Sequence, residues 1–340
     1  MSDFCKRLES AVDNAIEKIA ESRREDTLVF PVFTDLHTTD VNHENTHKLV
    51  SALRLITEKI KCSAVINLGD NFCMLGRGIH ITNNELKKRF DELFSAVHNA
   101  SGVPLINVAG NHDGVGTEFF KPDFWNEITK GKYGNTMAVY DDEGCWYYAD
   151  YDKADLRFVV PCAPHDSDIE RAAPTPLWTF GKPQLEWLEK VALCTDKNVI
   201  VLSHVPFFYK FTGEREKDMI NVWDGERERT MYISSICGDI EDAKSAVNIL
   251  NNFNAKSQGR LKAVLSGHTH SDSLWLPNQK KEELENPLSC TQLVSASACT
   301  LTENEEMLGL SIDIMLWSPS FDELQFIRVG DGADRKIKFE

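Results

Sequence analysis

Short unbroken apolar runs alternate along this chain with longer stretches in which apolar residues recur every three or four positions. The short runs are rich in Val, Ile and Leu and lack alternation, which predicts strands buried on both faces. They are Thr27–Thr34, Ala64–Leu68, Val103–Ala109, Asn198–Ser203 and Leu261–Ser266. The longer stretches predict helices at His47–Ile60, Asn84–Ala100, Pro183–Leu193 and Asp239–Phe253. This order of strand and helix is typical of an α/β fold.

A second kind of extended run is interrupted by polar turns and predicts antiparallel strands, which we expect to form a second sheet. These runs are Met137–Tyr140, Trp146–Tyr151, Arg157–Pro161, Leu274–Leu276, Gln292–Ala296, Ser311–Trp317 and Gln325–Val329. Two long loops, Gly114–Thr136 and Val205–Gly238, carry several aromatic residues. Long loops of this kind in a compact domain are usually functional, so we interpret both as lids.

The first 26 residues predict one amphipathic helix, because Phe4, Leu8, Val12, Ile16 and Ile19 recur at helical spacing between charged residues. We expect this helix to pack on a single domain formed by residues 27–340, since no repeat or linker divides the rest. The segment has no unbroken apolar stretch, so a signal peptide is not expected. No run is long enough to span a bilayer.

Composition sets the class of protein and its partners. The chain has 340 residues, 42% of them apolar, which is ample for a sizeable core. Its formal net charge of −16 disfavours long nucleic acid as a partner, because phosphate backbones are bound by Lys and Arg. The nine cysteines show no CxxC pairs, which indicates reduced thiols and a cytoplasmic protein.

Five polar clusters follow the predicted buried strands, at the strand ends where α/β sheets bind ligands. They are Asp35-Leu36-His37, Gly69-Asp70-Asn71, Gly110-Asn111-His112-Asp113, Ser203-His204 and Gly267-His268-Thr269-His270. Each cluster alone also fits a surface pair or a turn, but five of the ten histidines fall inside them. Carboxylate and amide oxygens mixed with imidazoles suit Mn, Fe or Zn, and the donors suffice for two ions. Two neighbouring metal ions are a device for splitting phosphate esters.

The spacing within the clusters supports this hypothesis. Asp35 and His37 are two residues apart at a strand end, so both side chains can reach one ion. His268 and His270 repeat the arrangement. Asp70, next to flexible Gly69, can bridge two ions with its two oxygens.

The ordered set D-x-H, G-D, G-N-H-[DE], H and G-H-x-H closely resembles the calcineurin-like metallophosphoesterase superfamily over residues 35–270. The resemblance implies a four-layer α/β/β/α sandwich with two packed mixed β-sheets and a dinuclear metal centre. By position, one ion would take Asp35, His37, Asp70 and His270, and the other Asp70, Asn111, His204 and His268. The segment Ile327–Arg335 is also similar to the tail of some bacterial and phage members.

The resemblance also implies a mechanism, the in-line attack of a metal-bridging hydroxide on phosphorus. His112 would stabilise charge or protonate the leaving oxygen, and Asp113 would hold and polarise His112. Arg77 is a candidate to clamp phosphate, and His80 and His165 are candidates for the mouth of the site, whereas His43, His47 and His98 are interpreted as surface residues.

We therefore predict a metal-dependent phosphoesterase acting on a small phosphodiester or phosphomonoester. One alternative is a nuclease of the same superfamily, which the acidic balance disfavours. Another is a non-catalytic interaction module on the same fold, which the complete set of ligands disfavours. A phosphoprotein substrate is less expected, because arginine-bearing motifs do not follow the G-D and G-N-H clusters. The sequence leaves metal identity and oligomeric state open.

Overall fold

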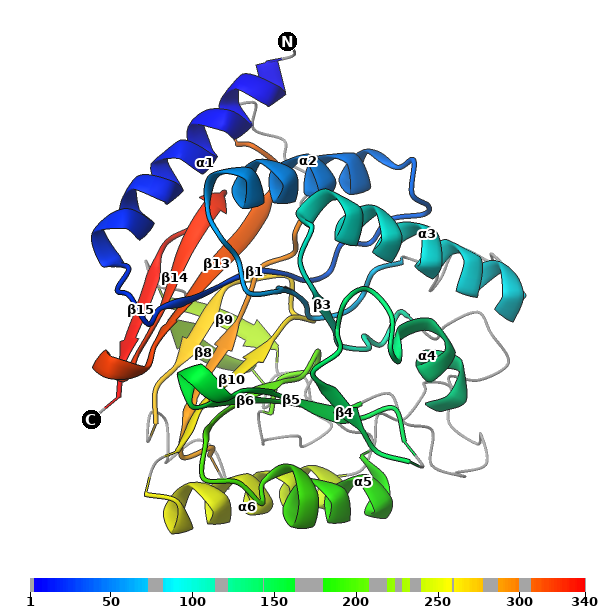
Figure 1. Cartoon of the computed structure of the whole chain (residues 1–340). Helices are drawn as coiled ribbons and strands as arrows, with labels where there is room; N and C mark the ends of the chain where they lie inside the picture. The colour runs from blue at the N-terminus through cyan, green and yellow to red at the C-terminus, as the bar shows by residue number, and fades with distance from the viewer. Residues whose placement is uncertain are drawn as a thin grey trace.

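Two β-sheets lie face to face between layers of helices in the computed structural model of the chain (Figure 1). The predicted four-layer α/β/β/α sandwich with two mixed sheets is confirmed. The structure describes residues 3–72, 82–113, 122–142, 144–162, 180–207, 219–223, 228–232, 240–258, 260–277, 287–299 and 307–339.

The first sheet has six strands and carries three of the polar clusters. Its order is β15 (Arg335–Lys338), β14 (Glu323–Gly330), β13 (Ser311–Ser318), β1 (Leu28–Phe33), β2 (Val65–Asn67) and β3 (Leu105–Asn107). Strands β1, β2 and β3 are parallel and are connected through α2 (Glu44–Lys59) and α3 (Asn83–Ser101). Strand β13 pairs antiparallel with β1, Val29 facing Leu316. Helices α1 (Asp3–Ser22), α2 and α3 lie over the outer face (Figure 1).

The second sheet has nine strands and carries the other two clusters. Its order is β4 (Ala138–Tyr140), β5 (Tyr147–Tyr151), β6 (Leu156–Val160), β7 (Asn198–Leu202), β10 (Leu261–Ser266), β12 (Thr291–Val294), β11 (Ser273–Trp275), β8 (Met219–Trp223) and β9 (Glu228–Tyr232). The central strands β6, β7, β10 and β12 are parallel. Helices α5 (Gly181–Trp187) and α6 (Ile240–Lys256) cover the outer face (Figure 1), and a π-helical turn (Leu188–Ala192) extends α5.

The core between the sheets is formed by the inward side chains of both. Phe30 of β1 contacts Phe158 of β6 edge to face, with ring centroids 5.2 Å apart. Trp317 of β13 is fully buried, and its indole nitrogen donates to the carbonyl of Ala154 at 3.0 Å. These contacts fix the two sheets against each other. The carboxyl ends of their parallel strands consequently meet on one side of the sandwich.

The predicted pairing of the strands needs correction. The runs expected to form a separate antiparallel sheet divide between both sheets: β4, β5 and β6 join the nine strands, and β13 and β14 join the six. The pattern of one strand predicts its burial but does not specify its neighbours in space.

The two segments predicted to be loops need correction in part, since each contains regular structure. The first includes α4 (Pro122–Thr129), in which Trp125 is buried and contacts Phe90 with ring centroids 5.5 Å apart. The second includes the antiparallel hairpin β8–β9 at the sheet edge. The aromatic residues Phe124, Trp125 and Phe207 are therefore core residues and not parts of a lid. Residues 114–121, 208–218, 224–227 and 233–238 of these segments lie outside the described residues.

Helix α1 covers β14 and α2 with its apolar face, where Leu8, Val12, Ala15 and Ile19 are buried. None of the helices that the structure describes is long and apolar enough to cross a bilayer. The assignment of residues 27–340 to a single domain stays a prediction.

We expect Ile19→Ala to lower the free energy of unfolding by about 2–4 kcal/mol, because it leaves a cavity beneath α1 where Ile19 is now fully buried. Urea unfolding followed by circular dichroism measures the change. Glu17→Ala, on the exposed face of the same helix, is the control and should stay within about 0.5 kcal/mol. An Ile19 variant as stable as the wild type would show that α1 adds no stability to the fold.

Candidate metal centre

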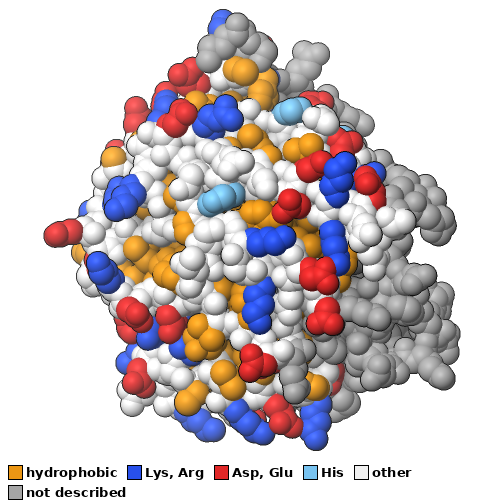
Figure 2. All heavy atoms as spheres, turned by 45° about the vertical axis from the view of Figure 1, so that its right-hand side comes forward, with side chains coloured by type: hydrophobic (Ala, Val, Ile, Leu, Met, Phe, Trp, Pro, Cys, Tyr) orange, Lys and Arg blue, Asp and Glu red, His pale blue; other side chains and the backbone are white. Residues whose placement is uncertain are grey.

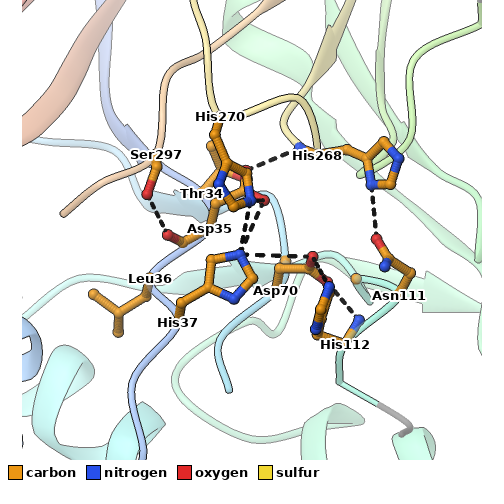
Figure 3. A network of polar contacts seen from close by, with 12 residues as sticks. Thr34, Asp35, Leu36, His37, Asp70, Asn111, His112, His268, His270 and Ser297 are labelled. Carbon is orange, nitrogen blue, oxygen red and sulfur yellow. Dashed lines mark hydrogen bonds and ion pairs between the residues drawn. The ribbon is translucent and has the colours of Figure 1, made fainter. Parts of the chain in front are cut away.

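The five polar clusters meet at the carboxyl ends of β1, β2, β3, β7 and β10. Figure 3 shows the residues that follow β1, β2, β3 and β10. Two groups of side chains offer donor atoms, and within each group these atoms all lie within 4.8 Å of one another. The groups are Asp35, His37 and His270, and Asp70, His204 and His268. The structure thus brings together residues that are up to 235 positions apart, 35 to 270, in the sequence.

The first group is centred on one carboxylate oxygen of Asp35. His270 Nε2 lies 3.2 Å from Asp35 Oδ1, and His37 Nε2 lies 3.7 Å from it. The two imidazole nitrogens are themselves 2.8 Å apart. Asp35 Oδ1 is buried and has no hydrogen-bond partner. A buried carboxylate oxygen without a donor, facing two imidazoles, is the arrangement expected of a cation site.

The other oxygen of Asp35 is fully used in holding the side chain. Asp35 Oδ2 accepts hydrogen bonds from Thr34 Oγ1 at 2.8 Å and from the backbone N–H of His268 at 2.9 Å. The carbonyl of Asp35 accepts from Ser297 Oγ at 2.7 Å (Figure 3). Such contacts orient a ligand and leave its remaining oxygen aimed at the ion.

The second group is more deeply buried. His204 Nε2 lies 3.1 Å from Asp70 Oδ2 and 3.0 Å from Asn111 Oδ1, and His268 Nδ1 lies 2.8 Å from the same amide oxygen. His204 Nδ1 lies 2.8 Å from the carbonyl of Leu68, which places the ring proton on Nδ1. In the neutral form of this ring the lone pair is on Nε2 and points at Asp70 and Asn111.

Asp70 lies between the two groups. Its Oδ2 faces His204 Nε2 at 3.1 Å, His112 Nε2 at 3.8 Å and His37 Nε2 at 4.0 Å. Its Oδ1 accepts the backbone N–H of His112 at 2.7 Å. Asp70 is consequently placed where a carboxylate could serve both groups, as its position in the sequence predicts.

The backbone of these loops is strained. Asp35, His37, Asp70, His268 and His270 all have positive φ, between 46° and 70°. Non-glycine residues in this region cost free energy and cluster at functional sites. Gly110 allows its turn to lie close against Asp70, because a Cβ at this position would clash with the backbone nitrogen and the carboxylate of Asp70.

Asp113 does not contact His112 as predicted. Its buried carboxylate accepts the backbone N–H groups of Gly110 at 2.8 Å, Asn71 at 2.8 Å and Asp70 at 3.1 Å. His112 Nδ1 is buried without a hydrogen-bond partner. The prediction that Asp113 polarises His112 is therefore wrong: the side chain turns inward and joins the G-D turn to the G-N-H-D turn. Burial and the charge of Asp70 raise the pKa of Asp113 to about 7, against these hydrogen bonds.

A buried amide network behind Asp70 was missed in the sequence. Asn67 Nδ2 donates to Asn71 Oδ1 and to Asn107 Oδ1, both at 3.0 Å, and Asn67 Oδ1 accepts the N–H of Gly69 at 3.0 Å. The hydroxyl of Tyr147 donates to the carbonyl of Asn107 at 2.9 Å, which ties the network to the other sheet. An asparagine ending each of two apolar strands, Val65–Asn67 and Leu105–Asn107, is the sequence signal.

Burial and neighbouring charges shift the pKa values of several groups in the site. Burial disfavours the protonated form of His204, but Asp70 and Asp35 outweigh it and raise its pKa to about 9. Burial and the charge of His204 lower the pKa of His268 to about 4. Burial opposes ionisation of Asp35, yet the charge of His204 and the neighbouring imidazoles of His270 and His37 hold its pKa well below the usual range. The site therefore combines ionised carboxylates with one protonated imidazole. A metal cation can replace the proton of that imidazole.

The donor set fits the metal ions that the clusters predict. Hard carboxylate and amide oxygens together with imidazole nitrogens suit Mn, Fe or Zn and do not select among them. Of the additional candidates, Arg77, His80 and His165 lie outside the described residues. His43 caps α2, its Nδ1 accepting the N–H of Asn45 at 3.2 Å.

Comparison with known proteins identifies the pattern. A family model described as calcineurin-like phosphoesterase matches residues 29–272, a range that contains all five clusters. The chain is similar to the solved structure of PhoD, with a TM-score of 0.55 and 12% identity over 92% of this chain and 68% of that one. A conserved uncharacterized protein from Streptococcus pneumoniae TIGR4, described as a predicted phosphoesterase, matches at a TM-score of 0.34 and 10% identity, over 92% and 98% of the two chains. No curated protein matches the chain.

Proposed function

Because this chain belongs to the calcineurin-like phosphoesterase family, we propose that it hydrolyses a small phosphodiester or phosphomonoester with the help of two metal ions. The observation that carries the proposal is the meeting of two Asp/His groups at Asp70. One group is Asp35, His37 and His270, and the other is Asp70, His204 and His268, with the amide oxygen of Asn111 beside it.

The bound ions would neutralise phosphate charge and lower the pKa of a water from ~15.7 to near ~7, which supplies a nucleophile at neutral pH. The protein's part is to hold the donors and to position the ester. Thr34 and the His268 amide fix Asp35, and the Leu68 carbonyl fixes the His204 ring.

His112 is the residue best placed to contact the substrate. It is partly exposed, and its Nε2 faces Asp70 Oδ2 at 3.8 Å. The ring lies edge to face with His37, at 4.9 Å between centroids, which limits its orientation. Burial lowers the pKa of His112 while Asp70 opposes the change. A proton passed from His112 Nε2 to the leaving oxygen would assist cleavage of the ester bond.

Surface charge supports a small substrate over a nucleic-acid strand. On the face drawn in Figure 2, basic side chains lie interspersed with acidic ones over the described part of the surface. The chain as a whole carries a net charge of −16. A nuclease would need a continuous basic track for the strand.

We propose the cytoplasm as the location of the protein. The buried cysteines Cys62, Cys162 and Cys290 are free thiols, which fits a reducing compartment.

A substrate screen tests the proposed activity. We expect purified protein loaded with Mn²⁺ to hydrolyse bis-p-nitrophenyl phosphate, p-nitrophenyl phosphate or a cyclic nucleotide, and chelation with EDTA to abolish the reaction, because the nucleophile depends on the metal. Release of p-nitrophenolate gives the rate for the first two compounds. Hydrolysis of the diester alone would define a phosphodiesterase. The absence of turnover with Mn, Fe and Zn would contradict the proposal and favour a non-catalytic interaction module.

A further inference from the structure

Two arginines in the C-terminal segment Ile327–Arg335 are unexplained by the proposed function. Arg328 lies on β14 and Arg335 begins β15, and their side chains are only 2% and 1% exposed. Burying a charge is costly unless it is paired and hydrogen-bonded. Their partners should therefore show what the segment does.

The partners are two carboxylates from different sheets. Arg328 Nε donates to Asp313 Oδ1 at 2.9 Å, and Arg335 also pairs with that oxygen. Both arginines reach Asp272 Oδ1, Arg328 through Nη2 at 2.7 Å and Arg335 through Nη1 at 2.6 Å. Asp313 belongs to β13 of the six-stranded sheet, whereas Asp272 lies just before β11 of the nine-stranded sheet. Two cations and two anions balance one another in this cluster.

Asp272 comes two residues after His270, in the loop that carries the last two predicted metal ligands. His268 and His270 have φ of 70° and 58°, so the loop is strained and must be held by its surroundings. At its start, Asp35 Oδ2 accepts the N–H of His268 at 2.9 Å. At its end, Asp272 is held by the two arginines and by the N–H of Ala296 at 3.0 Å.

The pairing leaves little room for adjustment. Gly332 packs over it with a φ of 118°, and a Cβ there would lie 2.9 Å from Arg328 Nη1 and 3.0 Å from Asp272 Oδ2. The guanidinium of Arg328 also donates to the carbonyl of Asp331 at 2.9 Å. Asp272 is consequently held by the C-terminal hairpin as well as by the N–H of Ala296.

We propose that Asp272, Arg328 and Arg335 are positioning residues through which the C-terminal hairpin sets His268 and His270 for metal binding. The proposal rests on the proposed function. It distinguishes Asp272, which links the hairpin to the loop, from Asp313, which pairs with the arginines within the six-stranded sheet.

The test is Asp272→Asn, with Mn²⁺ affinity and stoichiometry measured by isothermal titration calorimetry. We expect affinity to fall about 10–100-fold, the usual effect of losing a residue that orients a ligand, with two binding sites retained. Asp150→Asn is the matched control: it breaks the Arg157 Nε–Asp150 Oδ1 pair of 2.7 Å between β6 and β5, in the same sheet. This control should lose stability but bind Mn²⁺ as the wild type does.

A milder variant, Arg335→Lys, keeps the charge but gives up the planar guanidinium, and replaces Asp272→Asn should that protein fail to fold. Circular dichroism establishes folding in each case. Wild-type Mn²⁺ affinity in the folded variants would overturn the positioning role. A wild-type protein that binds none of Mn²⁺, Fe²⁺ and Zn²⁺ would overturn the proposed function itself, and this inference with it.

Discussion

Asp70→Asn is expected to nearly abolish hydrolysis and to reduce the number of metal ions bound per chain. Asp70 Oδ2 faces donors of both groups, at 3.1 Å from His204 Nε2 and 4.0 Å from His37 Nε2. An amide in its place has no negative charge and cannot hold two cations close together. Metal ions contribute several kcal/mol of transition-state stabilisation, so we expect kcat/KM to fall by roughly 10²–10⁴-fold.

Elemental analysis by mass spectrometry counts the ions, and initial rates with the best substrate of the screen give kcat/KM. The matched control is Asp155→Asn, since Asp155 also has a left-handed backbone, with a φ of 46°, but lies in the turn before β6. Asn tolerates this conformation well, so backbone strain is not the cause of any difference. An Asp70→Asn protein that keeps two ions and full activity would contradict the role of this residue.

His112→Asn should separate chemistry from metal binding. The His112 ring is partly exposed beside Asp70 and is predicted to act on the leaving oxygen, whereas only its backbone N–H holds Asp70. We therefore expect two ions to remain bound while kcat falls by about 10²–10⁴-fold, the usual contribution of a general acid. The loss should be larger for alkyl or phenyl esters than for p-nitrophenyl esters, because p-nitrophenolate leaves without a proton.

His47→Asn, on the exposed side of α2, is the control for this substitution and should leave both quantities unchanged. Equal losses for good and poor leaving groups would argue that His112 stabilises phosphate charge and transfers no proton. Unchanged turnover would remove His112 from the mechanism.

The buried strands and their polar ends could be predicted from the sequence because both depend on local pattern. The unbroken apolar run Leu261–Ser266 reads as a doubly buried strand, and the structure has β10 at those residues. Each cluster follows such a strand directly, so the convergence of Asp35, Asp70 and His268 follows from the parallel order of the strands. The roles of these residues as ligands stay predictions.

Contacts between distant segments could not be predicted in the same way. Asp113 is next to His112 in the chain, yet its carboxylate turns to the amides of the Gly69–Asn71 turn. The hairpin β8–β9 lies at a sheet edge and contains Glu228 and Arg229, so its composition is unlike that of the buried strands. Arg335 binds Asp272 from 63 residues away, and no local sequence pattern indicates this contact.

Each predicted ion would take donors from both sheets: Asp35, His37 and Asp70 with His270, and Asp70 and Asn111 with His204 and His268. A cation bound there would cross-link the two sheets, so that one sheet could not shift against the other without loss of the ion. Binding of the ion and packing of the two sheets would then be thermodynamically linked, so that each stabilises the other. Changes at the interior contact of Phe30 with Phe158, which is not part of the donor set, would then alter ion occupancy.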